Sequence, residues 1–274
     1  MKKYISIFTT FLLTHLAINA QQANFFLSTI DTVFSGLSYD SIPTGILIEK
    51  AITGKGTTYY GTENDSTSDF NVFYGLYKAI KDGSNNRASY WDYNDFKQAI
   101  DYASAENAIP IFILNYDYNT LKPYFIDSNL IDTIGGRLYD VVGRVESPYV
   151  TRKLFSATTS RSYGASDSIR FICNQENYFS NDTSTIATIE INFDDGLGYR
   201  IISLNEPIDI HYISDGEKLI QYRITLTNSM VLKAHSTFQL KTEWEFELDE
   251  EGFISGTIPY NAEADDSDGL ACLR

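Results

Sequence analysis

Two carboxylates stand where strand-like segments end in the first half of the chain. Glu49 ends the apolar segment TGILIE, and Asp117 ends the apolar segment IPIFILNYD. Carboxylates at the carboxyl ends of parallel strands are where α/β folds place catalytic acids, and such a pair could act as acid and base in glycoside cleavage. Aromatic residues of the same half could serve as sugar platforms: Tyr90, Trp91, Tyr116 and Tyr118. Only about two strand-helix units are visible, too few for a barrel, so the aromatics fit core and rim packing equally well.

A second acidic group lies in INFDDGLGY, residues 191–199, where Asp194 and Asp195 precede Gly196. Calcium is a candidate ligand here, although it prefers several spaced oxygen ligands over two adjacent carboxylates. The flanking residues alternate between apolar and polar, and Asp and Gly tolerate the positive φ angles of hairpin loops. The pattern therefore favours a turn between two strands. Under the calcium alternative, millimolar calcium should raise the melting temperature, and Asp195→Ala should abolish that rise.

Other reactive residue types show no catalytic spacing. Beyond the first 20 residues the histidines are His211 and His235, both in alternating strand-like segments. The sequence contains no G-x-S-x-G turn, H-E-x-x-H pair, C-x-x-C pair or P-loop. Cys173 lies in an apolar run that favours a buried small residue, and its pairing with Cys272 is left open. The sequence thus favours no catalytic residues and no cofactor, with the Glu49 and Asp117 pair as the enzymatic alternative.

The charge and the first residues indicate the compartment. The formal net charge is −15, which argues against nucleic acid as a partner because phosphate binding requires surplus Lys and Arg. Residues 1–20 begin with Lys2 and Lys3, continue with an uncharged apolar segment and end in Ala20, the layout of a secretory signal peptide. No later segment is apolar enough to span a membrane. We therefore expect a secreted or cell-surface protein whose partner is an extracellular glycan or protein.

Residues 24–148 alternate between helix-like and strand-like patterns, which predicts an α/β module. Residues 44–51 read as a short strand, and the apolar residues of SDFNVFYGLYKAIKDG recur at helical spacing between Asp69 and Gly83. The segment DYNDFKQAIDYASAEN predicts a second amphipathic helix. It leads into AIPIFILNYDYN, whose continuous apolar core predicts a buried strand.

From residue 149 the pattern changes to a period of two. TIEINFD, IDIHYI and LIQYRITLT each place apolar residues on one face and polar residues on the other. Short alternating strands separated by Asp, Gly, Ser and Asn predict an antiparallel β-sandwich over residues 149–242.

Part of this region resembles a known family. ATIEINFDDGLGYR followed by IDIHYISDGEKLIQYRITLTN resembles the polycystic-kidney-disease (PKD) type of immunoglobulin-like repeat, which has a Phe-Gly-Asp-Gly turn, then a Tyr, then a Gly opening a long strand. The matching residues are Phe193, Asp195, Gly196, Tyr212, Gly216, Ile220, Tyr222 and Ile224. Asp194 stands where the family has Gly, and Lys218 where an aromatic is common. The resemblance covers about a third of the chain and implies a non-catalytic spacer or adhesion module, of the kind found in secreted multidomain proteins of Gram-negative bacteria.

Residues 243–274 predict a β-hairpin that turns at Glu251 and Gly252, followed by an acidic tail. The tail has no packing pattern, and we expect the chain to be the front portion of a larger secreted protein, with a further domain starting here. The overall expectation is an α+β multidomain protein, an α/β module followed by a PKD-like β-sandwich. Its expected role is non-catalytic binding, spacing or adhesion. The alternative is a carbohydrate-active hydrolase using Glu49 and Asp117.

Overall fold

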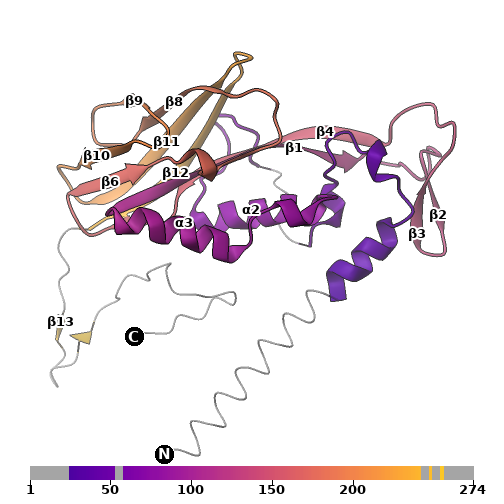
Figure 1. Cartoon of the computed structure of the whole chain (residues 1–274), viewed down its shortest axis with the longest axis horizontal. Helices are drawn as coiled ribbons and strands as arrows, with labels where there is room; N and C mark the ends of the chain where they lie inside the picture. Colours follow the sequence, from indigo (N-terminus) through magenta and orange to yellow (C-terminus); the bar gives the residue numbers. More distant parts are fainter. Residues whose placement is uncertain (1–24, 53–57, 242–246, 249–253, 256–274) are drawn as a thin grey trace, which may run out of the picture. The chain divides into compact units, whose positions relative to one another are not determined.

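The computed structural model describes residues 25–52, 58–241, 247–248 and 254–255 (Figure 1). The predicted signal peptide, Cys272 and the acidic tail lie outside these residues. The chain forms two compact units: residues 1–57, 74–90 and 116–154 make up the first, and residues 58–73, 91–115 and 155–274 the second. The division falls inside α2, β1 and β4, and the predicted domain boundary after residue 148 stays a prediction.

The first unit is built from short elements around a small apolar core. It holds helical residues 25–34, the 3-10 turns η1 (Tyr39–Ser41), η2 (Ile48–Lys50) and η3 (Arg87–Ser89), most of α2 (Phe70–Gly83), and the hairpin of β2 (Ile131–Ile134) and β3 (Arg137–Asp140). Its core consists of Phe34, Leu37, Ile42, Leu47, Ile131, Leu138 and Tyr149.

The predicted strand over residues 44–51 is wrong. Ile46 and Leu47 form only single bridges, to Ser84 and Asn119, and the chain then turns into η2. The backbone bonds of this segment are divided between two neighbours: the Leu47 N–H donates to the Gly83 carbonyl at 2.9 Å, and the Ile46 carbonyl accepts from the Asn119 N–H at 2.8 Å. The apolar residues of this segment, Ile46, Leu47 and Ile48, are buried, but they do not form a continuous strand.

Both predicted helices are confirmed. In α2 the Asp69 carboxylate accepts from the Val72 N–H at 2.8 Å, and the helix ends at Gly83 as expected. The second helix, α3 (Tyr93–Ala105), begins with a capping box in which Asp92 and Asp95 each accept from the other residue's backbone N–H. Both helices could be predicted from the sequence because helix caps and helical periodicity depend only on residues close together in the chain.

The second unit contains two sheets. The first has the order β10-β6-β1-β4 with β7 also paired to β1, and the second has the order β5-β12-β11-β8-β9. The strands are β1 (Ala108–Leu121), β4 (Tyr149–Thr159), β5 (Tyr163–Gly164), β6 (Ser168–Ile172), β7 (Tyr178–Ser180), β8 (Ile186–Asn192), β9 (Tyr199–Ile202), β10 (Pro207–His211), β11 (Gly216–Leu226) and β12 (Val231–Leu240), with η4 (Gln175–Asn177) before β7. One buried apolar cluster draws residues from both sheets, which is compatible with the predicted β-sandwich.

Within residues 149–242 the strands pair antiparallel as predicted, except that β5 and β12 run parallel. Neighbours in the second sheet from β9 to β12 pair antiparallel, as do β6 and β10. By contrast, β1 runs parallel to β6 and β7. Strand β1 is also buried on both faces: its odd-numbered residues Ile109, Ile111 and Ile113 join the core between the sheets, while Phe112 packs on Phe96 of α3 at a centroid distance of 5.4 Å. Coverage of both faces explains its continuous apolar sequence.

The short strands β13 (Glu247–Leu248) and β14 (Ile254–Ser255) pair antiparallel, in agreement with the predicted hairpin. Within the described part of the chain, no helix is both long and apolar enough to cross a membrane.

Cys173 is buried, with 1% of its surface exposed, and burial raises the pKa of its thiol to about 12. We expect Cys173 in a Cys272→Ala variant to resist a thiol reagent at neutral pH until denaturant unfolds the second unit, because only the exposed thiolate reacts. The measurement is the release of thionitrobenzoate with and without denaturant. Labelling at the rate of a free thiol in the native protein would contradict this burial.

Candidate functional site

Glu49 lies against the end of β1 in the first unit. Its Oε1 accepts from the Leu121 N–H at 2.9 Å and from the Thr120 hydroxyl. Its Oε2 is buried without a hydrogen-bond partner among the described residues. The carboxylate thus caps a backbone donor at a strand end, a structural role that any catalytic role would have to share.

Asp117 makes a different contact. Its carboxylate lies 2.8 Å from the Lys153 ammonium of the neighbouring strand β4. Because side chains alternate along a strand, Asp117 and Thr120, three positions apart, face opposite sides of β1. The structure therefore engages the two carboxylates in separate contacts, and their use as a catalytic pair stays a prediction.

The aromatics of the first half are largely packed. Tyr116 and Tyr118 are buried, and Tyr90 lies between Tyr77 and Tyr116 with both centroid distances 5.9 Å. Burial, and then the neighbouring tyrosines, raise the pKa of Tyr116. Trp91 packs edge-on against Phe96 and Phe179 in the second unit. Burial of Tyr116 and Tyr118 leaves their ring faces unable to receive a sugar.

The Asp194-Asp195 run forms the predicted turn between β8 and β9. Asp194, Gly196 and Gly198 have φ angles of 62°, 86° and 71°. The Asp194 carboxylate accepts from the Leu219 N–H at 3.1 Å, and Asp195 accepts from the Leu197 N–H at 3.2 Å and from the Arg200 guanidinium at 2.6 Å. Oxygens that calcium would need are therefore already engaged. Over the described residues, no group of three or more His, Cys, Asp or Glu is placed to hold a metal ion.

His211 lies beside a serine and a carboxylate, but in the wrong geometry for nucleophilic catalysis. Its Nδ1 is 3.2 Å from the Ser168 hydroxyl and 3.9 Å from the Asp167 carboxylate. A catalytic triad needs the hydroxyl on one ring nitrogen and the carboxylate on the other. Here both meet the same nitrogen, on an exposed edge of the first sheet.

The outer face of the second sheet carries a row of four side chains across its strands. Strand registers place Tyr199 opposite Asn192, Asn192 opposite Gln221, and Gln221 opposite His235. The Asn192 amide donates to the Gln221 amide oxygen at 3.0 Å. We call these four residues the polar row. Side-chain amides and an imidazole can both donate and accept hydrogen bonds, so the row presents both kinds of group to a ligand.

A hollow of about 230 Å³ is lined by three of the four residues of the polar row, Tyr199, Gln221 and His235. Its other lining residues include Thr62, Glu63 and Lys233. The charges around it are compensated, since Lys233 pairs with Glu63 and Arg223 lies 3.6 Å from Glu190. The Arg223 guanidinium also lies 4.0 Å from the centre of the Tyr199 ring, which holds that ring in place.

Sequence reasoning placed Gln221, Arg223 and His211 on the polar faces of their strands, but it did not find the polar row. Alternation shows which residues of one strand point outward. It does not show which residues of different strands stand side by side, because that depends on register. The outward tyrosine at the start of β9 was the signal that could have drawn attention to this face. Comparison with known proteins finds no family model and no curated protein that matches the chain.

Proposed function

We propose that the protein is an exported, non-catalytic binding protein of the bacterial surface or exterior, and that its polar row binds a neutral carbohydrate. The observation that carries this proposal is the alignment of Tyr199, Asn192, Gln221 and His235 on one open sheet face. An aromatic ring offers an apolar face to the C–H groups of a sugar, while amides and an imidazole bond its hydroxyls.

The charge around the polar row favours a neutral ligand over an ionic one. Each cation beside it has an acidic partner, Lys233 with Glu63 and Arg223 with Glu190. An anionic ligand would also approach a chain with a net charge of −15, and long-range repulsion would slow its association. Sugars avoid both costs, because their hydroxyls are uncharged and exchange hydrogen bonds with water for hydrogen bonds with the row.

We further propose that residues 149–242 form an immunoglobulin-like module of the PKD type. Two observations support this assignment. The Tyr212 hydroxyl donates to the Phe193 carbonyl at 3.1 Å, which ties the Tyr of the resembling motif to its Phe. Asp194 adopts a left-handed φ of 62°, which glycine adopts most easily, at the position where the family has Gly. A spacer or adhesion role is common to such modules and agrees with glycan binding.

The test is calorimetric titration with neutral cello-, xylo-, malto- and chitooligosaccharides. We expect one class to bind, and Tyr199→Ala to weaken that binding by at least about tenfold through loss of the stacking ring. His235→Ala should weaken it less, because it removes one hydrogen-bonding group. Thr225→Ala, on the same sheet face but outside the row, is the matched control and should bind normally. Equal affinity of Tyr199→Ala and Thr225→Ala would refute the role of the polar row, as would absence of binding to every class.

A further inference from the structure

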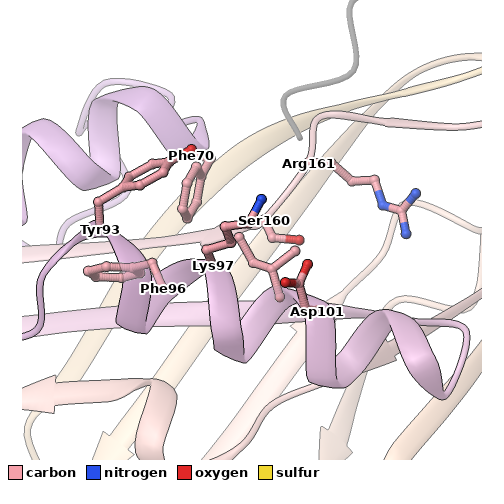
Figure 2. Close-up of a pocket in the computed structure, with 8 residues that line it drawn as sticks. Phe70, Tyr93, Phe96, Lys97, Asp101, Ser160 and Arg161 are labelled. Atoms are coloured by element: carbon pink, nitrogen blue, oxygen red, sulfur yellow. The ribbon is translucent and has the colours of Figure 1, made fainter. Parts of the chain in front are cut away.

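A second hollow lies in the second unit, where α3 meets the start of α2 and the loop after β4 (Figure 2). We call it the α3 pocket. It is lined by Phe70, Tyr93, Phe96, Lys97, Ile100, Asp101, Ser160 and Arg161. Figure 2 shows the rings of Phe70, Tyr93 and Phe96 gathered at one end, and Asp101 and Arg161 at the other. The pocket is therefore apolar at one end and charged at the other.

The apolar end is shaped by the packing of α3 on the first sheet. Phe96 is fully buried, and its ring lies 6.2 Å from that of Phe70 and 5.3 Å from that of Trp91. The cavity volume is about 40 Å³. A water molecule needs roughly 10 to 15 Å³ of such volume, so the space admits a small apolar group such as a branched alkyl end. Larger rings would require displacement of the packed phenylalanines.

Ser160 supplies a polar group without an internal partner. The residue is 5% exposed and its N–H donates to the Pro110 carbonyl at 2.9 Å. Ser160 lines the pocket, and no hydrogen bond of its hydroxyl is found among the described residues. A hydroxyl that lines a pocket without an internal bond can both donate to and accept from a molecule in the pocket.

Two cations, Lys97 and Arg161, line the pocket. Lys97 is on α3, and Arg161 is on the loop that the Thr159 hydroxyl steadies by donating to the Arg161 carbonyl at 2.7 Å. Among the residues that the structure describes, neither Lys97 nor Arg161 forms an ion pair, and Asp101 is the one acidic residue of the lining. The lining carries a net charge of +1 in a chain whose net charge is −15. This local excess is complementary to an anion.

We propose that the α3 pocket binds a small carboxylic acid with a branched apolar end. The alkyl group would lie among Phe70, Phe96 and Ile100. The carboxylate would meet the Arg161 guanidinium and the Lys97 ammonium, while the Ser160 hydroxyl donates to it. This proposal is independent of the polar row, since it uses α3 and the loop after β4 and no residue of the second sheet's outer face.

The probe is isovalerate, and its neutral isostere isovaleramide tests the charge. The full chain carrying Trp244→Phe keeps Trp91 as its one tryptophan, and the contact of Trp91 with Phe96 makes its fluorescence a local reporter. We expect isovalerate to change the emission with a dissociation constant of about 1 mM, and isovaleramide to bind about tenfold more weakly. Raising the salt concentration should reduce the difference, because salt screens the attraction between the carboxylate and the two cations.

Variants separate this site from general effects. Arg161→Gln and Lys97→Gln should each reduce the preference for the acid over the amide, and Ser160→Ala should weaken both ligands. Arg152→Gln, an exposed arginine of β4, is the matched control and should behave as the parent chain. If Lys97→Gln lowers the helix content by circular dichroism, Arg161→Gln decides the question. Equal affinity for acid and amide, an unchanged emission with both, or equal behaviour of Arg161→Gln and Arg152→Gln would each overturn the proposal.

Discussion

Raising the pH above about 10 is expected to unfold the protein cooperatively, because several tyrosines are held neutral by burial. Tyr222 is fully buried and its hydroxyl lies 2.9 Å from that of Ser236. Burial raises the pKa of Tyr222, and burial followed by the nearby Asp195 and Asp194 carboxylates raises the pKa of Tyr212. Burial, and next the neighbouring Tyr90, raise the pKa of Tyr116 in the first unit.

The sign of the effect follows from which state loses the proton first. Below about pH 10 these tyrosines are neutral in both the folded and the unfolded state, so their ionisation does not change the free energy of unfolding. Above it the unfolded chain ionises while the folded chain cannot, so stability falls as pH rises toward the folded pKa values. Each tyrosine contributes about 1.4 kcal/mol per pH unit, so three give about 4 kcal/mol per pH unit. Against a stability of roughly 5 to 15 kcal/mol, unfolding is expected above about pH 11, and burial adds to this slope by also raising the pKa values of Tyr90 and Tyr149.

The lowered pKa of Lys50 changes the free energy of unfolding in the opposite direction, and it does so at lower pH than the tyrosines. Burial, and then the neighbouring Arg87, lower its pKa, while Asp31 partly offsets both. Between the folded and the unfolded pKa of Lys50, the unfolded chain therefore binds more protons than the folded chain. Stability from this residue rises with pH up to about 10.5 and is constant above it. The alkaline loss of stability is thus attributable to tyrosines.

The measurement compares tyrosinate absorbance near 295 nm with the sheet signal in circular dichroism during alkaline titration. We expect the two changes to coincide for the buried tyrosines. Tyr222→Phe should reduce the slope of the unfolding free energy with pH by about 1.4 kcal/mol per pH unit, whereas Tyr102→Phe, 63% exposed, should leave it unchanged. Ionisation of the buried tyrosines with the sheets still intact would show that these side chains reach solvent in the folded state.

Features of the fold that depend on neighbouring residues were predictable from the sequence, whereas those that depend on distant residues were not. Helices α2 and α3 were predictable because Asp69 and Asp92 cap them through bonds to residues two or three positions away. Strands β8 and β11 were predictable from alternation. The segment at residues 44–51 was not, because its bonds go to Gly83 and Asn119. The parallel placement of β1 beside β6 was also hidden, since nothing within either strand specifies its neighbour.

The candidate sites follow the same rule. The turn at Asp194 and Asp195 was predicted because its residue types and its flanking strands are contiguous. The polar row requires three strand registers, and the α3 pocket requires Phe70 and Ser160 to meet α3 from distant parts of the sequence. The prediction that Glu49 and Asp117 end two strands is wrong, because Glu49 lies in η2 and β1 continues past Asp117 to Leu121. The sequence also could not show that Leu121 and Lys153 would engage these carboxylates.

Asp195→Ala is expected to destabilise the second unit by about 3 kcal/mol whether or not calcium is present. The Asp195 side chain is 1% exposed and pairs with Arg200, whose guanidinium lies over the buried Phe193 ring at 5.4 Å. Breaking a buried pair by removing one partner costs about 3 to 5 kcal/mol, and the lower value applies because the Arg200 side chain is 26% exposed. The Arg200 Nε already lacks a hydrogen-bond partner among the described residues. Loss of the Asp195 carboxylate would therefore add a second unsatisfied group to the same guanidinium.

Two further substitutions assign the loss to the ion pair and not to the turn. Asp195→Asn keeps an acceptor for the Leu197 N–H and should lose less than Asp195→Ala. Asp194→Gly removes the bond to the Leu219 N–H but relieves a left-handed residue at φ 62°, so it should change stability by no more than about 1 kcal/mol.

Denaturant unfolding with chelator and with millimolar calcium distinguishes the ion pair from a metal site. If Asp195 serves Arg200, Asp195→Ala is less stable by the same amount in both buffers, and calcium leaves the parent chain unchanged. If Asp195 serves calcium, the parent gains stability with the ion, the variant does not, and the two are equally stable in chelator. The second pattern would mean that the contact with Arg200 gives way to the ion. The first is expected because an internal cation already neutralises this carboxylate at 2.6 Å, and calcium would have to displace it.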